Sequence, residues 1–155
     1  MFVPAVAFSN VVIAIHVAVA VIAFGLVIVW PFISDGVERL HPGAVPALHR
    51  TRQQLSRLIV NPGLALMLIS GIYLASDLHE WKRFFTQWGL GMVIVLGGLE
   101  GAVISRQEGK LADLGATLDG AGSAAAQAAR TLSRRVSWLM AVLVLVTIYL
   151  MSVQA

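Results

Sequence analysis

Four long apolar segments dominate the pattern of hydrophobic and polar positions along the chain. They cover residues 11–30, 58–74, 88–105 and 136–152. A helix needs about 20 mainly apolar residues to cross the hydrocarbon core of a bilayer, which is ~30 Å thick. Backbone polar groups cannot bond to water in that core, so each segment is expected to be a helix. The pattern therefore predicts an all-α fold, in which residues 1–155 form one domain, a four-transmembrane-helix bundle.

The segments between the spans contain further helical patterns. Residues 47–57 are polar with leucines at helical spacing, and we expect this helix to run straight into the second span. Pro62-Gly63 then lies just inside the membrane, where it should kink or loosen the helix. Residues 34–43 contain glycine and proline and indicate a turn, and a second turn is expected near residues 120–122. The second and fourth helices are therefore expected to extend into the cytoplasm.

The composition supports a membrane protein and excludes several other classes. The chain is 58% hydrophobic and only 12% charged, about half the charged fraction of a typical soluble domain. It contains no cysteine, which rules out disulfides and thiolate metal sites. No basic segment precedes the first apolar run and no small-residue cleavage site precedes Trp30, so we expect this span to be retained. The lipid bilayer is the expected partner, and the net charge of +3 does not indicate nucleic-acid binding.

The distribution of basic residues predicts the orientation of the bundle. Nine of the 11 Lys and Arg residues precede the second span or lie between the third and fourth. These nine are Arg39, Arg50, Arg52, Arg57, Arg106, Lys110, Arg130, Arg134 and Arg135. The opposite side has only Lys82 and Arg83. Because short cytoplasmic loops carry the excess of basic residues, both termini are expected to be extracytoplasmic.

His16 is the one histidine inside a predicted span. Polar groups are costly in the bilayer and generally have a structural or functional reason to be there. His16 shares a helical face with Ala20 and Ala23, and small residues suit the face that points into the bundle. The imidazole could be a structural group bonded to Ser70, Tyr73 or a carbonyl. It could equally be a proton relay or a ligand to a metal or haem.

Methionines recur on the stripes of the other three spans that are expected to face inward. Methionine is usually a flexible core residue that fills gaps. Together with histidine, however, it forms an axial ligand pair for haem iron and also suits Cu(I). Met92 lies at about the same depth as His16, and Met67 lies nearer the middle of the membrane. The pair His16 and Met92 is therefore the first candidate for a metal or cofactor site, with Met67 as the second choice of partner.

Glu100 is the one carboxylate inside a predicted span. It lies about five residues from the inner end, or roughly 7.5 Å deep at 1.5 Å per residue. Arg57 and Arg135 begin the neighbouring spans on the same side. A structural ion pair between Glu100 and one of these arginines is the first expectation, and a proton-relay or haem-propionate network is the alternative. The chain has no phosphate-binding glycine loop, nucleophile elbow or zinc-protease motif, so no catalytic residue is assigned.

The order of these features resembles a known group of membrane proteins. An early His16, a basic polar helix, Arg57-Leu58 and Pro62-Gly63 are followed by the Trp88-x-x-x-Met92 opening of the third span. This layout resembles bacterial four-helix, haem-binding protoporphyrinogen oxidases and the copper-resistance D membrane domain. It is most similar to a related family of predicted integral membrane proteins without assigned function. The resemblance implies the bacterial cytoplasmic (inner) membrane, a haem b site using His16, and a role for Arg57 in that motif.

The chain departs from the oxidases at two places. Met92 stands where they carry a lysine, and Ser133, Arg134 and Arg135 stand where they carry an Asn-Glu pair. The resemblance therefore extends to haem binding rather than to the oxidase reaction. Three functions stay open: a haem b protein for electron transfer or haem handling, a copper handler, and an accessory membrane subunit without a cofactor. The Gly97-x-x-x-Gly101 face could pack within the protomer, or in a homodimer or larger membrane complex.

Overall fold

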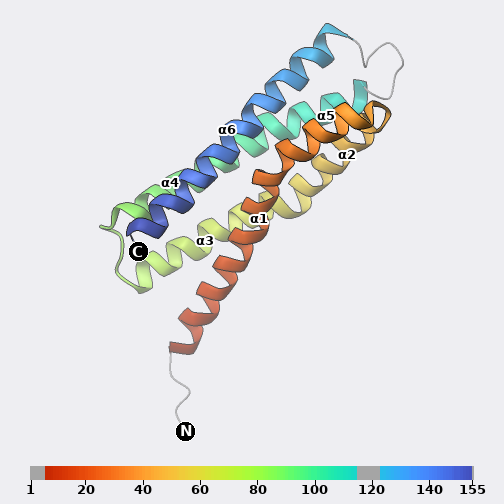
Figure 1. Cartoon of the computed structure of the whole chain (residues 1–155). Coiled ribbons are helices and arrows are strands. Elements are labelled where there is room, and N and C mark those ends of the chain that lie inside the picture. The colour runs from red at the N-terminus through yellow and green to blue at the C-terminus, as the bar shows by residue number, and fades with distance from the viewer. Residues whose placement is uncertain (1–5, 115–122, 155) are drawn as a thin grey trace.

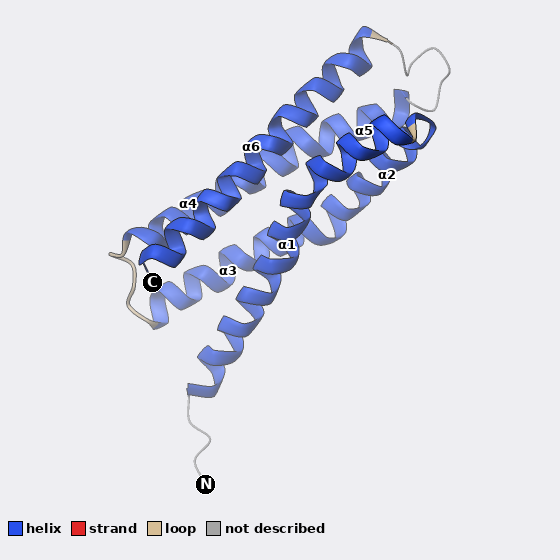
Figure 2. Cartoon of the chain, viewed as in Figure 1, coloured by secondary structure: helices blue, strands red, loops and turns tan. Residues whose placement is uncertain are grey.

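The computed structural model describes residues 6–114 and 123–154, which form four long helical stretches without strands (Figures 1 and 2). The first is α1, Val6–Leu40. The second joins α2, Val45–Leu55, to α3, Asn61–Asp77, through the π-helical segment Ser56–Val60. The third joins α4, Phe84–Gly98, to α5, Ser105–Leu114, through the π-helical segment Leu99–Ile104. The fourth is α6, Ala124–Gln154. The predicted turn near residues 120–122 lies outside the described residues.

The helices form an up-and-down bundle in which α1 packs on α3 and α6, α2 on α5, and α4 on α3 and α6. The beginning of α1 and the end of α6 lie at the end of the bundle where residues 78–83 connect α3 to α4 (Figure 1). A bond of 2.6 Å from the Ser9 hydroxyl to Asp77 holds the start of α1 against the end of α3. Residues 41–44, which connect α1 to α2, lie at the opposite end. Below, the first end is called the terminal end and the second the basic end.

All four stretches are long and apolar enough to cross a membrane. Large apolar side chains point outward along them, with Val21 at 67% exposure and Ile69 at 65%. Inside, Leu96 and Val144 are fully buried and form a core with Phe24, Leu64 and other apolar residues. Water would not tolerate an apolar surface this large, whereas lipid would. The prediction of a four-helix membrane bundle is confirmed.

The first helix is longer than the pattern predicts. The proposed turn over residues 34–43 is wrong for most of its length, because α1 continues through Pro31 to Leu40 and the chain reverses only over residues 41–44. Pro31 removes one backbone hydrogen bond, a loss that membrane helices tolerate when neighbouring helices support them. Here Pro31 is buried, and Phe32 packs edge-on against Trp138 of α6 with ring centroids 4.8 Å apart.

The π-helical segments interrupt two of the stretches at the same level. The Asn61 amide donates to the Ser56 carbonyl, and the Ser105 amide donates to the Glu100 carbonyl. The first segment directly precedes Pro62-Gly63, so the expected loosening of this helix is confirmed. Such widened turns often mark functional sites.

Glycine allows a close approach of two helices near the first π-helical segment. A Cβ atom added to Gly63 would lie 3.3 Å from the Cβ of Ala23, which places α3 directly against α1. Gly97 and Gly101, by contrast, have nothing within 4 Å of such an atom. The pair therefore does not mediate close helix packing within the described part of the chain.

Candidate functional site

A cavity of about 450 Å³ lies between α1, α3, α4 and α6 in the half of the bundle nearest the terminal end. It is half-enclosed, and most of its wall is apolar. Its volume falls in the range of pockets that hold small molecules and cofactors, roughly 300–1,000 Å³. The wall residues used below are His16, Met67, Gly71, Gly89, Thr147 and Met151, with Glu80 and Arg83 at the rim.

The hydrogen bonds of His16 define which of its nitrogens faces a ligand. Its Nδ1 lies 2.6 Å from the Ser70 hydroxyl oxygen. The one proton of that hydroxyl is directed at the Leu66 carbonyl, 2.7 Å away, or the Met67 carbonyl, 3.2 Å away. When that hydroxyl donates to a carbonyl, Nδ1 carries the imidazole proton and donates to Ser70, and Nε2 keeps a lone pair. A ligating histidine is commonly fixed in this way by a bond from its other nitrogen.

Two glycines keep the cavity open. A Cβ atom on Gly71 would lie 3.4 Å from Leu90 and 3.6 Å from the Cε1 atom of His16, in ordinary contact with both. A Cβ atom on Gly89 would clash with the terminal methyl group of Met151. A larger residue at position 71 would fill the space beside the imidazole, and one at position 89 would displace the Met151 side chain.

The rim of the cavity is polar and lies at the terminal end. Arg83 donates to Glu80 at 2.8 Å and stacks over the Phe85 ring at 5.1 Å. On the α6 wall, Thr147 accepts a bond of 3.3 Å from the indole nitrogen of Trp88. The cavity thus combines an apolar interior with one cationic group where it opens.

The structure brings together some of the predicted cofactor residues and separates others. Met67 lines the cavity with His16, as does Met151, which the sequence analysis did not select. Met92 is buried but is not part of the cavity wall. Arg57 is exposed and precedes Met67 by ten residues along the α2–α3 stretch, or about 15 Å. A shared site of His16 with Met92 and Arg57 is therefore not formed.

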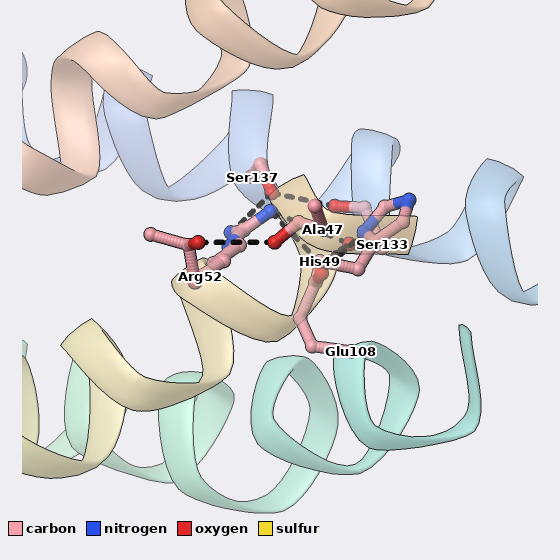
Figure 3. Close-up of polar contacts among 7 residues, drawn as sticks. Ala47, His49, Arg52, Glu108, Ser133 and Ser137 are labelled. Carbon is pink, nitrogen blue, oxygen red and sulfur yellow. Dashed lines mark hydrogen bonds and ion pairs between the residues drawn. The ribbon is translucent and has the colours of Figure 1, made fainter. Parts of the chain in front are cut away.

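A second polar group, at the basic end, is a fully buried charge network (Figure 3). Glu108 on α5 is completely inaccessible to solvent. Its carboxylate accepts from Arg52 at 3.0 Å, from His49 at 2.5 Å and from the Ser133 hydroxyl at 2.5 Å. The Arg52 guanidinium also donates to Ser137 at 2.7 Å. Three helices thus contribute to one network, which satisfies the buried carboxylate on every side.

Glu100 lies beside this network but outside its hydrogen bonds. It is buried, its carboxyl group interacts with the Ser56 hydroxyl through a hydrogen bond, and it interacts electrostatically with Arg52. Glu100, Arg52 and Trp30 all line a cavity of about 20 Å³. This volume suits about one water molecule, and the indole nitrogen of Trp30 has no other partner within the described chain. Arg52 stacks on the Trp30 ring at 5.4 Å.

The predicted ion pair of Glu100 with Arg57 or Arg135 is not present. Both arginines are exposed, and the buried ion pair joins Arg52 to Glu108 instead. Water stabilises the charges of the two exposed arginines, so burying them against Glu100 would gain little. Arg52 lies on the same helical stretch as Arg57, about one and a half helical turns further from the membrane centre.

Arg52, His49 and Glu108 were not selected from the sequence. His49 and Arg52 lie in a polar helix expected to extend into the cytoplasm, and Glu108 lies between the third and fourth predicted spans. One signal was available. Positions 49, 52 and 56 share one helical face. Positions 133 and 137 share a face of another helix, among small residues. A polar stripe that faces small residues is typical of a buried network rather than a solvated surface.

Comparisons with protein-family models, with curated proteins and with solved structures find no match to this chain. Across residues 6–114 and 123–154, no group of three or more His, Cys, Asp or Glu side chains is arranged to hold a metal ion. The geometry of the two sites is therefore the basis for a functional assignment.

Proposed function

We propose that this chain is a membrane-embedded cofactor protein that binds one haem b in the cavity beside His16. The observation that carries the proposal is the position of this imidazole. His16 lines a 450 Å³ apolar cavity, and its Nδ1 atom is bonded to Ser70, which leaves Nε2 as the nitrogen available to a ligand. Bound haem would supply one-electron redox chemistry, and this suits electron transfer or haem handling.

The other residues of the cavity fit the chemistry of this group. Apolar walls exclude water from the faces of a porphyrin. Gly71 leaves room beside the imidazole, and Gly89 leaves room beside Met151. Arg83 at the rim could form charge-assisted bonds with a propionate, and the thioethers of Met67 and Met151 are the available second ligands on the cavity wall.

Copper is the second candidate, supported by the presence of His16, Met67 and Met151 in one cavity. These are ligand types that Cu(I) accepts. A single ion, however, requires its ligands to converge within about 2–2.5 Å of one point, as in other sites of this kind. A cavity of about 450 Å³ is far larger than such a site, so the geometry favours the larger cofactor.

We also propose the bacterial cytoplasmic membrane as the location, with both termini outside. The excess of basic residues supports this orientation, because nine of the 11 lie on the side of the basic end. The cavity would then open toward the extracytoplasmic side.

The test is the absorption spectrum and metal content of protein purified from membranes of cells supplied with haem precursor. Haem in the wild type and in His79→Asn, with loss of haem in His16→Ala, would support the proposal. His79 is an exposed histidine at the same end of the bundle, and its backbone φ of 56° suits asparagine. Stoichiometric copper without haem would favour the second candidate. A protein that binds neither would support an accessory subunit and overturn the proposal.

A further inference from the structure

The buried network at the basic end contains a polar atom that the network itself does not satisfy. His49 is 4% exposed, and its Nδ1 atom bonds to Glu108. Its Nε2 atom is buried without a hydrogen-bond partner among the described residues. The hydroxyl of Ser34 on α1 is in the same condition. Buried polar atoms without a partner are costly, so each of these requires an explanation.

The two atoms lie on the wall of one small cavity. It has a volume of about 10 Å³ and lies between α1, α2 and α6. Both Ser34 and His49 line it. About 10–15 Å³ is sufficient for one water molecule when polar partners are present. A water bound there would lie beside both side chains.

This small cavity leads toward solvent. It shares part of its wall with a more open cavity of about 250 Å³ at the basic end. The shared residues are Glu38, Arg130 and Arg134. In the opposite direction, the apolar core around Phe24, Leu64 and Leu96 closes the bundle. A polar route therefore runs from the basic end to His49 and, through its hydrogen bond, to Glu108.

We propose that Ser34, His49 and Glu108 form a proton-exchange site that a bound water connects to the aqueous phase at the basic end. A proton from solution reaches the water and then Nε2 of His49. The Nδ1 proton passes along the existing hydrogen bond to the Glu108 carboxylate. The net change is one proton moved from solution to Glu108, with His49 converted to its other neutral tautomer. The return of the proton reverses these steps.

Both acidic and basic side chains surround His49. The titratable or charged groups that face it from the neighbouring elements are Asp35 and Glu38 on α1, Arg52 on its own helix, Glu108 on α5, and Arg130 and Arg134 on α6, with Glu100 beyond Arg52. The basic groups disfavour a bound cation in the small cavity. The acidic groups disfavour an anion. A neutral ligand such as water suits both.

The first test measures water exchange at His49 by NMR in ¹⁵N-histidine-labelled protein in lipid nanodiscs. His49→Gln assigns the signal by its loss. We expect the Nε2 site to exchange protons with water. Ser34→Val removes the hydroxyl and fills the cavity, so it should slow this exchange roughly tenfold, the equivalent of one lost hydrogen bond. Ser34→Ala keeps the space and should slow it less. An equal exchange rate in Ser34→Val would overturn the proposal.

The second test follows Glu108 directly by infrared spectroscopy after rapid acidification. A carboxyl band that is absent in Glu108→Gln should appear in the wild type, and it should appear more slowly in Ser34→Val and His49→Gln. A purely structural network would give the same rate in all folded variants, or no such band at any pH at which the protein stays folded. Either result would refute proton exchange. Circular dichroism of each variant verifies the fold, and haem content is not a variable in either test.

Discussion

The Glu108→Gln substitution tests the buried network most severely, because it keeps the shape of the side chain and removes its charge. Glu108 accepts three hydrogen bonds from Arg52, His49 and Ser133, and it has no exposed surface. The glutamine would leave the Arg52 guanidinium buried without its ion-pair partner. Removing one partner of a buried ion pair typically costs about 3–5 kcal/mol. Glu100 interacts electrostatically with Arg52 and should compensate in part, so we expect a loss near the lower end of that range.

The assay is thermal unfolding in nanodiscs by circular dichroism at one fixed scan rate, because membrane proteins often unfold irreversibly. By analogy with soluble proteins of similar length, a loss of ~3 kcal/mol should lower Tm by on the order of 10 °C. Arg57→Gln and Arg135→Gln are matched controls. Both remove an exposed arginine and should change stability by less than about 0.5 kcal/mol.

A double-mutant cycle separates the pair from its surroundings. Arg52→Met together with Glu108→Met should destabilise less than the sum of the two single changes, because each single change leaves one charge buried and unpaired. Wild-type stability of Glu108→Gln, or strict additivity of the two methionine substitutions, would refute the pairing.

Further predictions concern the cavity and the orientation. Ser70→Ala removes the partner of His16 and should weaken haem binding about 10–100-fold in a spectroscopic titration; unchanged affinity would count against the tautomer argument. Gly71→Leu should block haem uptake while the helical circular dichroism spectrum stays normal. Met92→Leu should leave the reduction potential unchanged, whereas Met67→Leu should lower it, because an axial thioether raises the potential; the reverse pattern in a potentiometric titration would restore Met92 as the ligand. A C-terminal reporter that is active only in the cytoplasm should stay silent, and activity would invert the orientation.

The fold could be predicted from the sequence because the membrane permits few alternatives. In lipid, an apolar segment of bilayer length must form all of its backbone hydrogen bonds within the protein. It can therefore only be a helix or part of a closed barrel. The end of the first helix was missed for a specific reason. Glycine and proline over residues 34–43 usually indicate a turn, but packing of Phe32 against Trp138 and burial of Pro31 favour continuation of the helix as far as Leu40.

The two sites differ in how much of them could be predicted. A histidine inside an apolar span stands out, and the expectation that His16 could bond to Ser70 is confirmed at 2.6 Å. Helical periodicity places positions 49, 52 and 56 on one polar face, but it does not identify the partner of Arg52 across the bundle. Each π-helical segment contains an extra residue, which rotates the following residues by about 100° relative to an uninterrupted α-helix. The residues that Ser56 and Glu100 face across the bundle therefore differ from those that an uninterrupted α-helix would give. Only the folded chain shows that Arg52 meets Glu108.

The most direct test of the central claim is a titration of haem b into haem-free protein in nanodiscs. The wild type and His79→Asn should bind one haem per chain with the same affinity. His16→Ala should bind at least about tenfold more weakly, because the described cavity wall offers no other imidazole and a lost metal ligand costs at least as much as a lost supporting bond to that ligand. Equal affinity in His16→Ala and the wild type would contradict the assignment of the site.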